Sequence, residues 1–217
     1  MGTLSYAATV SIDGYVADSD GDFQWTAPDD AVFAAHLERI AGVSTEVLGR
    51  RTYELMGFWD TYPDSADSPA AEREFARLWR DIDKVVVSST MTPELLTSER
   101  ARITPTVSLI ELQRIVERAE GAVEVFGPTT AAEAIRGGLI DDYHLFVVPR
   151  IVGGGLRALP DGVRLDLRLA EHRVFDGGVT YSRYRRGCAG PRPAHRSIMT
   201  AKRARGAQRR ASSPENR

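Results

Sequence analysis

The feature that most constrains the fold is an alternation of short apolar runs with amphipathic helical stretches. Strand-like runs at 4–12, 45–49, 84–90, 122–127 and 141–155 alternate with stretches whose apolar residues have helical spacing. Runs at 165–175 and 179–185 are joined by an Asp-Gly-Gly turn, which is typical of a hairpin. The pattern predicts an α/β fold with helices on both faces of a mainly parallel central sheet and an antiparallel C-terminal hairpin.

Local capping signals place the helix ends. Thr26, with Pro28 and Asp29 following, predicts a helix start that leads to Gly42. Ser108 and Glu111 have capping-box spacing for a helix over 108–119. Further helices are expected over 50–56, around the apolar spacing of 75–82, and from Pro128 to the Gly137-Gly138 pair.

The composition excludes several classes of protein. No apolar run approaches the roughly 18–20 residues that span a membrane. Cys188 is the single cysteine, which excludes an internal disulfide framework and a cysteine-based zinc site. The four histidines are scattered, and no P-C-x-x-C occurs, so we expect no metal and no zinc deaminase chemistry. These features predict a cytoplasmic protein.

The charge distribution divides the chain into two parts. Residues 187–217 are basic and poor in large apolar side chains, so we predict one domain over 1–186 followed by a disordered tail. An alternative is that the tail contacts nucleic acid, although no aromatic residues interleave its charges.

Residues suited to phosphate follow three of the predicted strands. They are Gly49, Arg50, Arg51 and Thr52 after the second strand, Ser88 and Ser89 after the third, and Gly127, Thr129 and Thr130 after the fourth. Ligands of open α/β sheets bind beyond the carboxyl ends of the strands, and helix N-termini and arginine favour phosphate there. Each segment could instead be ordinary helix capping, but together they predict a phosphorylated ligand. No G-x-G-x-x-G fingerprint follows the first strand.

These motifs, in this order, resemble the dihydrofolate reductase fold, and more closely its relative, the reductase domain of riboflavin biosynthesis. Ser11-Ile12-Asp13-Gly14 is similar to the S-[LI]-D-G of that branch. Gln24-Trp25-Thr26 and the Pro149 to Gly155 loop resemble two further motifs of the branch. The resemblance covers about residues 3–186 and implies a dihydrofolate reductase-like fold, an NADPH site and a homodimer.

The resemblance also implies roles for the phosphate-friendly residues. Arg50, Ser88 and Ser89 would contact the 2′-phosphate of NADPH. Arg51 and Thr52 would meet the pyrophosphate from one side, and Gly127, Thr129 and Thr130 from the other. The chain departs from dihydrofolate reductases at Pro128, where they have a second glycine; proline removes one backbone N–H donor.

The substrate side of the site rests on fewer residues. The segment Trp25 to Asp30 is similar to the W-x-x-P-x-D of bacterial dihydrofolate reductases, which would make Asp30 the proton-supplying carboxylate. The alternative is that Asp29 and Asp30 only complement a helix dipole. Tyr15, Trp25 and Thr26 would line the substrate pocket, and Asp13 is either a turn residue or a pocket residue.

Two functions follow from these residues. The first is an NADPH-dependent reductase of a small heterocyclic (pterin- or pyrimidine-like) or carbonyl substrate. The second is a module that binds NADPH or another nucleotide without turnover, which the missing second glycine favours. Both predict cofactor binding, and only the first predicts oxidation of NADPH.

Overall fold

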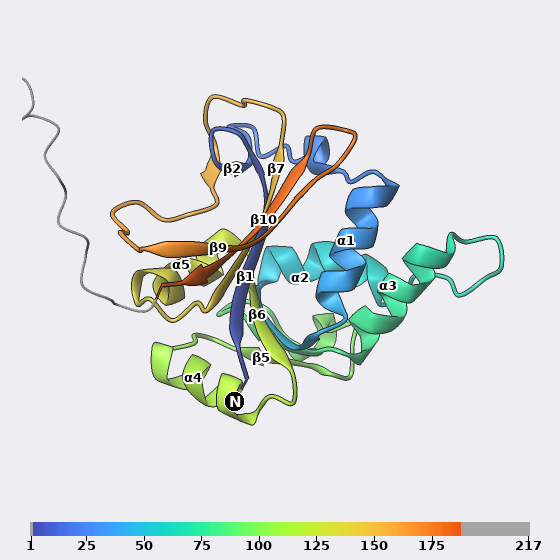
Figure 1. Ribbon diagram of the computed structural model, residues 1–217. Coiled ribbons are helices and arrows are strands. Elements are labelled where there is room, and N and C mark those ends of the chain that lie inside the picture. The colour runs from blue at the N-terminus through green and yellow to red at the C-terminus, as the bar shows by residue number, and fades with distance from the viewer. Residues whose placement is uncertain (1, 188–217) are drawn as a thin grey trace, which may run out of the picture. The chain divides into compact units, whose positions relative to one another are not determined.

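The computed structural model describes residues 2–187, which form an eight-stranded sheet covered by helices on both faces (Figure 1). The strands are β1 (Leu4–Ser11), β3 (Val43–Gly49), β4 (Asp83–Val87), β5 (Ala101–Thr104), β6 (Ala122–Phe126), β7 (Asp142–Val148), β9 (Leu167–Val174) and β10 (Thr180–Arg186). Their order across the sheet is β5-β4-β3-β6-β1-β7-β10-β9. The first six are parallel, and β10 is antiparallel to both β7 and β9, which confirms the predicted mainly parallel sheet with a C-terminal hairpin.

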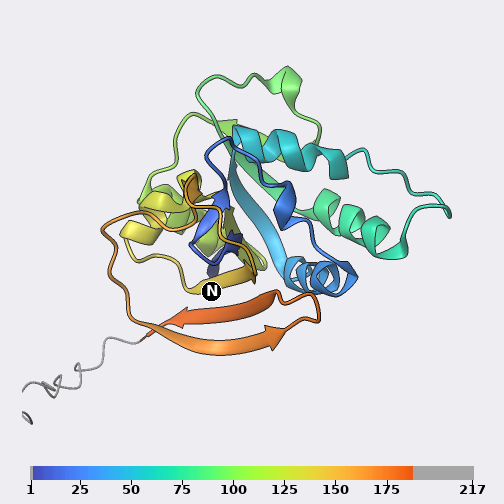
Figure 2. The same cartoon turned by 90° about the horizontal axis from the view of Figure 1, so that it is seen from above.

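Five α-helices pack in two layers, as Figure 2 shows from above. They are α1 (Asp30–Ile40), α2 (Arg50–Met56), α3 (Ala70–Asp81), α4 (Leu109–Arg118) and α5 (Pro128–Arg136). One core cluster lies between the sheet and α4 and α5, and includes Tyr6, Val125 and Ile135. A second lies on the face of α1 and α3, around Trp79 and Leu48, and a third joins α1 to Phe146 and Tyr181. Among the described residues, no helix is long and apolar enough to cross a membrane.

The predicted start of the first helix was wrong. Thr26 ends a short 3₁₀ turn (Gln24–Thr26), and its hydroxyl donates to the carbonyl of Phe23. Asp29 is the N-cap, and its carboxylate accepts from the backbone N–H of Val32 at 2.8 Å. The residue before Pro28 is extended, because proline disfavours helical backbone in its predecessor. The helix therefore begins beyond the proline.

Strand β5 and the small pairing of β2 (Tyr15–Ala17) with β8 (Leu156–Arg157) were not predicted from the sequence. These strands have two to four residues, so hydrophobic periodicity has little length over which to appear. The capping box of Ser108 and Glu111 is present at the start of α4, as predicted. Residues 188–217 of the predicted tail, with the nucleic-acid alternative, lie outside the described residues.

Candidate functional site

The predicted phosphate-binding segments lie at one edge of the sheet. Because β4, β3 and β6 are adjacent and parallel, their carboxyl ends lead out on the same side. The helices α2 and α5 begin directly after β3 and β6. The structure thus brings the two helix starts together, although they are 78 residues apart (Arg50 and Pro128).

Two glycines allow the helix starts to approach each other closely. A Cβ at Gly49 would lie 2.9 Å from the hydroxyl of Thr130, and a Cβ at Gly127 would lie 2.9 Å from the hydroxyl of Thr52. Gly127 also has a φ of +98°, which side chains other than glycine rarely adopt. Each glycine faces the threonine that follows the other strand. The result is a narrow backbone cradle in which hydroxyls and helix N–H groups converge.

Arg50 links this cradle to the loop after β4. Its Nε donates to Glu54 at 2.6 Å, and one terminal nitrogen donates to the Thr90 hydroxyl at 3.4 Å. The Ser88 hydroxyl accepts from the backbone N–H of Thr90 and of Met91, so it shapes this loop. The guanidinium of Arg50 is about half exposed, with its side chain at 45% of full accessibility, so it remains available to an anion. Arg51, Ser89 and Thr129 are exposed.

Asp13 joins the end of β1 to the glycine loop that follows β7. Its two carboxylate oxygens accept from the backbone N–H groups of Val152 at 3.2 Å and Gly153 at 2.7 Å. Hydrogen bonding, first from Ser11 and then from these backbone groups, lowers the pKa of Asp13. The carboxylate is therefore ionised and engaged in holding two loops together.

The other residues predicted for the substrate side surround the start of α1 and the β2–β8 pair. The indole N–H of Trp25 donates to the Asp22 carbonyl at 3.0 Å. The guanidinium of Arg157 lies over the ring of Tyr15, 5.0 Å from its centroid. Asp30 is the first residue of α1 and is exposed. Asp29 is the N-cap and Asp30 is the acidic residue of the first turn, so both carboxylates lie where they complement the helix dipole.

A row of buried charged residues was not singled out from the sequence. Lys84, Glu46 and Glu124 are register neighbours on β4, β3 and β6, and each is at most 1% exposed. Arg39 of α1 forms an ion pair with Glu124. The sequence does carry a signal for this row. One acidic residue lies inside each of two apolar strand runs, at 45–49 and 122–127, and a lysine begins a third run at 84–90. Such residues are rarely buried unless they are paired.

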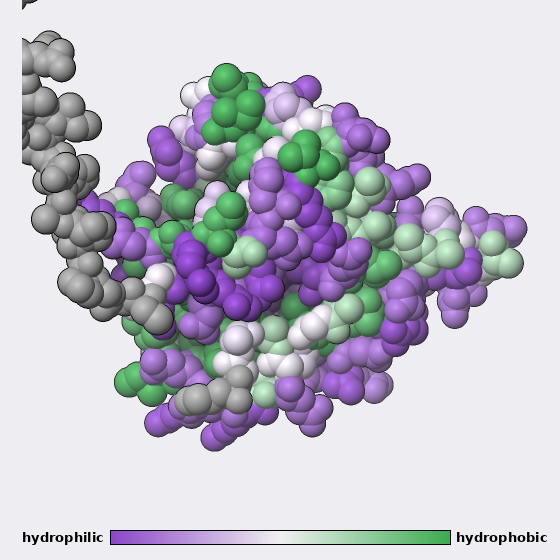
Figure 3. Space-filling view, in the orientation of Figure 1, coloured by the Kyte–Doolittle hydropathy of each residue, from purple (hydrophilic) through white to green (hydrophobic). Residues whose placement is uncertain are grey.

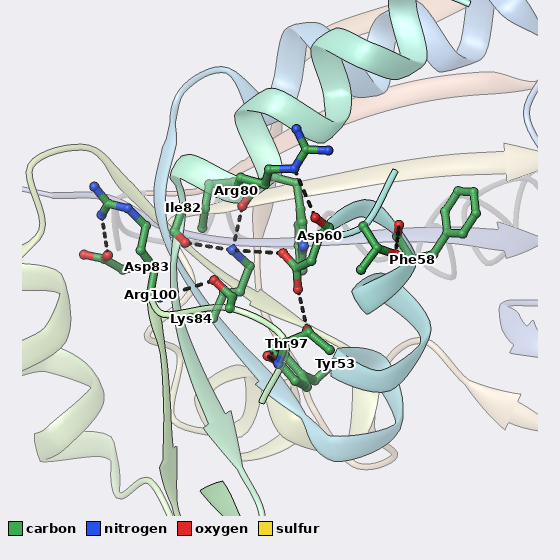
Figure 4. A network of polar contacts seen from close by, with 12 residues as sticks. Tyr53, Phe58, Asp60, Arg80, Ile82, Asp83, Lys84, Thr97 and Arg100 are labelled. Atoms are coloured by element: carbon green, nitrogen blue, oxygen red, sulfur yellow. Dashed lines mark hydrogen bonds and ion pairs between the residues drawn. The ribbon is translucent and has the colours of Figure 1, made fainter. Parts of the chain in front are cut away.

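Lys84 is held by several groups at once (Figure 4). Its Nζ donates to the carbonyls of Trp79 at 2.6 Å and Ile82 at 2.9 Å, and lies 4.0 Å from a carboxylate oxygen of Asp60. The other oxygen of Asp60 accepts from the Thr97 hydroxyl at 2.5 Å. Burial lowers the pKa of Lys84, and Asp60 opposes that shift.

Two cavities lie toward the amino-terminal ends of the strands, away from the cradle. The larger, about 850 Å³, lies between α4 and the strands β4 and β5. The smaller, about 290 Å³, lies beside α1 where hydrophilic side chains gather on the surface in Figure 3. Neither is lined by a residue predicted for the cofactor or the substrate. Among residues 2–187, no cluster of three or more His, Cys, Asp or Glu could hold a metal ion.

Comparison with solved structures shows a dihydrofolate reductase-like fold. A putative riboflavin biosynthesis protein from Shewanella sp. PV-4 is 21% identical, with a TM-score of 0.64 over 86% of this chain and 99% of that one. A dihydrofolate reductase from Enterococcus faecalis in complex with NADP(H) is 16% identical, with a TM-score of 0.55 over 86% and 98%.

A third similar structure is a diaminohydroxyphosphoribosylaminopyrimidine deaminase/5-amino-6-(5-phosphoribosylamino)uracil reductase from Thermotoga maritima. It is 18% identical with a TM-score of 0.62, and the match covers 86% of this chain but 57% of that protein. The comparison with curated proteins found no match. The family model described as the RibD C-terminal domain matches residues 3–181. With most of its length matched, the chain belongs to the RibD C-terminal domain family.

Proposed function

We propose that the protein is an NADPH-dependent reductase of a small heterocyclic (pterin- or pyrimidine-like) or carbonyl substrate. The observation that carries this proposal is the cradle at Gly49 and Gly127, where two helix starts converge beside Arg50. Membership of the RibD C-terminal domain family and the NADP(H) complex of the similar Enterococcus enzyme support the choice of cofactor.

The residues present fit the phosphates of this cofactor. The absence of a Cβ at Gly49 and Gly127 lets the hydroxyls of Thr130 and Thr52 lie close to the backbone, where they could donate to a pyrophosphate. Thr52, Thr129, Thr130 and Arg51 offer donors around the two glycines, whereas Pro128 offers no N–H. Arg50, with Ser88 and Ser89 beside it, would hold the 2′-phosphate, because guanidinium binds phosphate through two parallel hydrogen bonds.

The cofactor would supply a hydride, and the protein would position the substrate and provide a proton. Asp30 is the candidate proton donor, directly or through water, because its carboxyl is exposed at the first turn of α1 and Asp29 already serves as the cap. Tyr15, Trp25 and Thr26 would form the wall of the substrate site. Asp13 would act by fixing the loop at Val152 and Gly153.

The second candidate function is binding of NADPH without turnover. Pro128 in place of a glycine favours it, because proline removes one backbone N–H that could donate to the cofactor. Both functions predict binding, so turnover separates them. Consumption of NADPH with a pterin, a pyrimidine or a carbonyl compound supports the reductase, and its loss in Asp30→Asn with unchanged NADPH affinity would assign the proton to Asp30.

The binding step is tested by calorimetric titration with NADPH, NADH and NADP⁺ on the wild type and on Arg50→Ala. A charge-assisted hydrogen bond contributes about 1.5–3 kcal/mol, so NADPH binding should weaken roughly 10- to 150-fold while NADH binding barely changes. Arg136→Ala, at the far end of α5 in an exposed ion pair with Glu133, is the matched control. Absence of binding by every nucleotide would refute both candidate functions.

A further inference from the structure

The buried charges between the sheet and the helices α1 and α3 form one connected group. Lys84, Glu46 and Glu124 come from three adjacent strands, Arg39 from α1 and Asp60 from the loop before α3. The side chains of Lys84, Asp60 and Glu124 are at most 4% exposed, and that of Arg39 is 10% exposed. Water therefore screens these charges little, and their sum must be close to zero.

With every group ionised, the sum is not zero. Lys84 and Arg39 are positive, whereas Glu46, Glu124 and Asp60 are negative, which leaves one negative charge in excess. The neighbouring charges do not remove it. Asp142 pairs with Arg183 and Arg185, which leaves one positive charge there, but these arginine side chains are 30% and 49% exposed, so water screens that charge. Asp83 is matched by Arg100. Burial lowers the pKa of His144 to about 4, so that imidazole is neutral.

The unpartnered atoms show where a proton belongs. Three buried carboxylate oxygens of this group have no hydrogen-bond partner: Glu46 Oε2, Glu124 Oε1 and Asp60 Oδ1. Asp60 Oδ1 faces the ammonium of Lys84 at 4.0 Å, which favours its ionised form and leaves the two glutamates as the place for the proton. The two residues are directly opposite each other on β3 and β6. One proton between them would neutralise the group and give both oxygens a partner. Burial, and then the charge of Glu124, raise the pKa of Glu46, which agrees with this position.

We propose that Glu46 and Glu124 share one proton, and that this proton keeps β3 and β6 at the spacing that the cofactor cradle needs. The second half rests on the proposed function. Glu46 lies three residues before Gly49, and Glu124 lies three residues before Gly127. Loss of the proton would leave two carboxylates opposite each other on the strands that lead into the cradle, and like charges in that arrangement repel.

The close contacts of the cradle make it sensitive to such repulsion. There is no room for a methyl group between Gly49 and the Thr130 hydroxyl, or between Gly127 and the Thr52 hydroxyl. The pair thus acts as a positioning element, not as a group that touches the cofactor. NADPH affinity should fall as pH rises through the titration of the pair, because binding is linked to the protonated form.

The test is the pH dependence of NADPH affinity in the wild type and in Glu46→Gln. Glutamine keeps the shape and a donor for Glu124 but cannot lose a proton. Between about pH 7 and about pH 9, the 2′-phosphate changes little, because with a second pKa of about 6 it is already about nine-tenths ionised at pH 7. The wild-type Kd should rise roughly fivefold to tenfold, and that of Glu46→Gln less than about twofold. Glu117→Gln, exposed on α4, is the matched control and should follow the wild type.

A second measurement does not depend on the cofactor or on the variant's folding. The wild type should show an infrared band of a protonated carboxyl group at neutral pH that disappears at alkaline pH. Absence of that band would overturn the shared proton. A band with pH-independent NADPH affinity would overturn the link to the cradle. Failure to bind NADPH at any pH would refute the proposed function, and with it the effect of the proton on the cradle. The infrared band would still show whether Glu46 and Glu124 share a proton.

Discussion

Replacement of Arg39 by methionine would test how the buried charges contribute to stability. Arg39 is the ion-pair partner of Glu124, and its removal leaves that carboxylate unpaired in the core. Breaking a buried pair in this way costs roughly 3–5 kcal/mol. The lost stability has an upper limit, because the unpaired carboxylate can take up a proton instead. Protonating an ordinary glutamate, with a pKa of about 4.3, costs about 3.7 kcal/mol at pH 7. We therefore expect Arg39→Met to lose 3–4 kcal/mol (rough magnitude) at pH 7.

The stability deficit of Arg39→Met should also depend on pH. In Arg39→Met the folded state favours the protonated carboxyl, so the variant gains stability as pH falls toward the unfolded pKa. Its deficit relative to the wild type should shrink to about 1 kcal/mol at pH 5. Urea unfolding at both pH values, followed by the fluorescence of the buried Trp79, measures this difference.

Two variants control the experiment. Arg39→Met with Glu124→Met removes both charges and should recover most of the loss, because an apolar pair of similar size is well tolerated. Arg77→Met removes an exposed arginine of α3 that pairs with Glu74 and Asp81, and should cost less than about 1 kcal/mol. A deficit that is equal at both pH values, or a double variant as unstable as Arg39→Met, would show that packing rather than charge is responsible.

Gly127→Ala should lose about 1–3 kcal/mol of stability and weaken NADPH binding, whereas Gly162→Ala, which also has a positive φ but open space around it, should leave binding unchanged in calorimetry. Tyr53→Phe should cost about 1–2 kcal/mol in urea unfolding because its hydroxyl accepts a backbone N–H at 2.8 Å, whereas Tyr143→Phe, whose buried hydroxyl has no partner, should be neutral or stabilising. Burial lowers the pKa of His36 to about 3. Its contribution to stability is therefore present above the unfolded pKa of about 6.5 and is lost as pH falls from there toward 3. In urea unfolding, His36→Phe should lose less stability on acidification than the wild type.

Local sequence signals determined much of the fold. Apolar periodicity located the longer strands and the helices that pack on the sheet. Ser108 with Glu111 marked the start of α4. Both signals act within a few residues. The segments Gly49 to Thr52 and Gly127 to Thr130 were also identified from residue type. Their roles toward a cofactor stay predictions until binding is measured.

Only the tertiary structure decided which of these segments are neighbours. It placed β3 beside β6, and so brought Gly49 to Thr130 and Glu46 to Glu124, although 78 or more residues separate the members of each pair. Strand order is set by how buried faces pack across the whole domain, which no local pattern encodes. The charge balance around Glu46 depends on that order and on burial from water. The sequence therefore predicted the kinds of groups at the cradle, whereas the buried carboxyl pair behind it emerged only from the folded sheet.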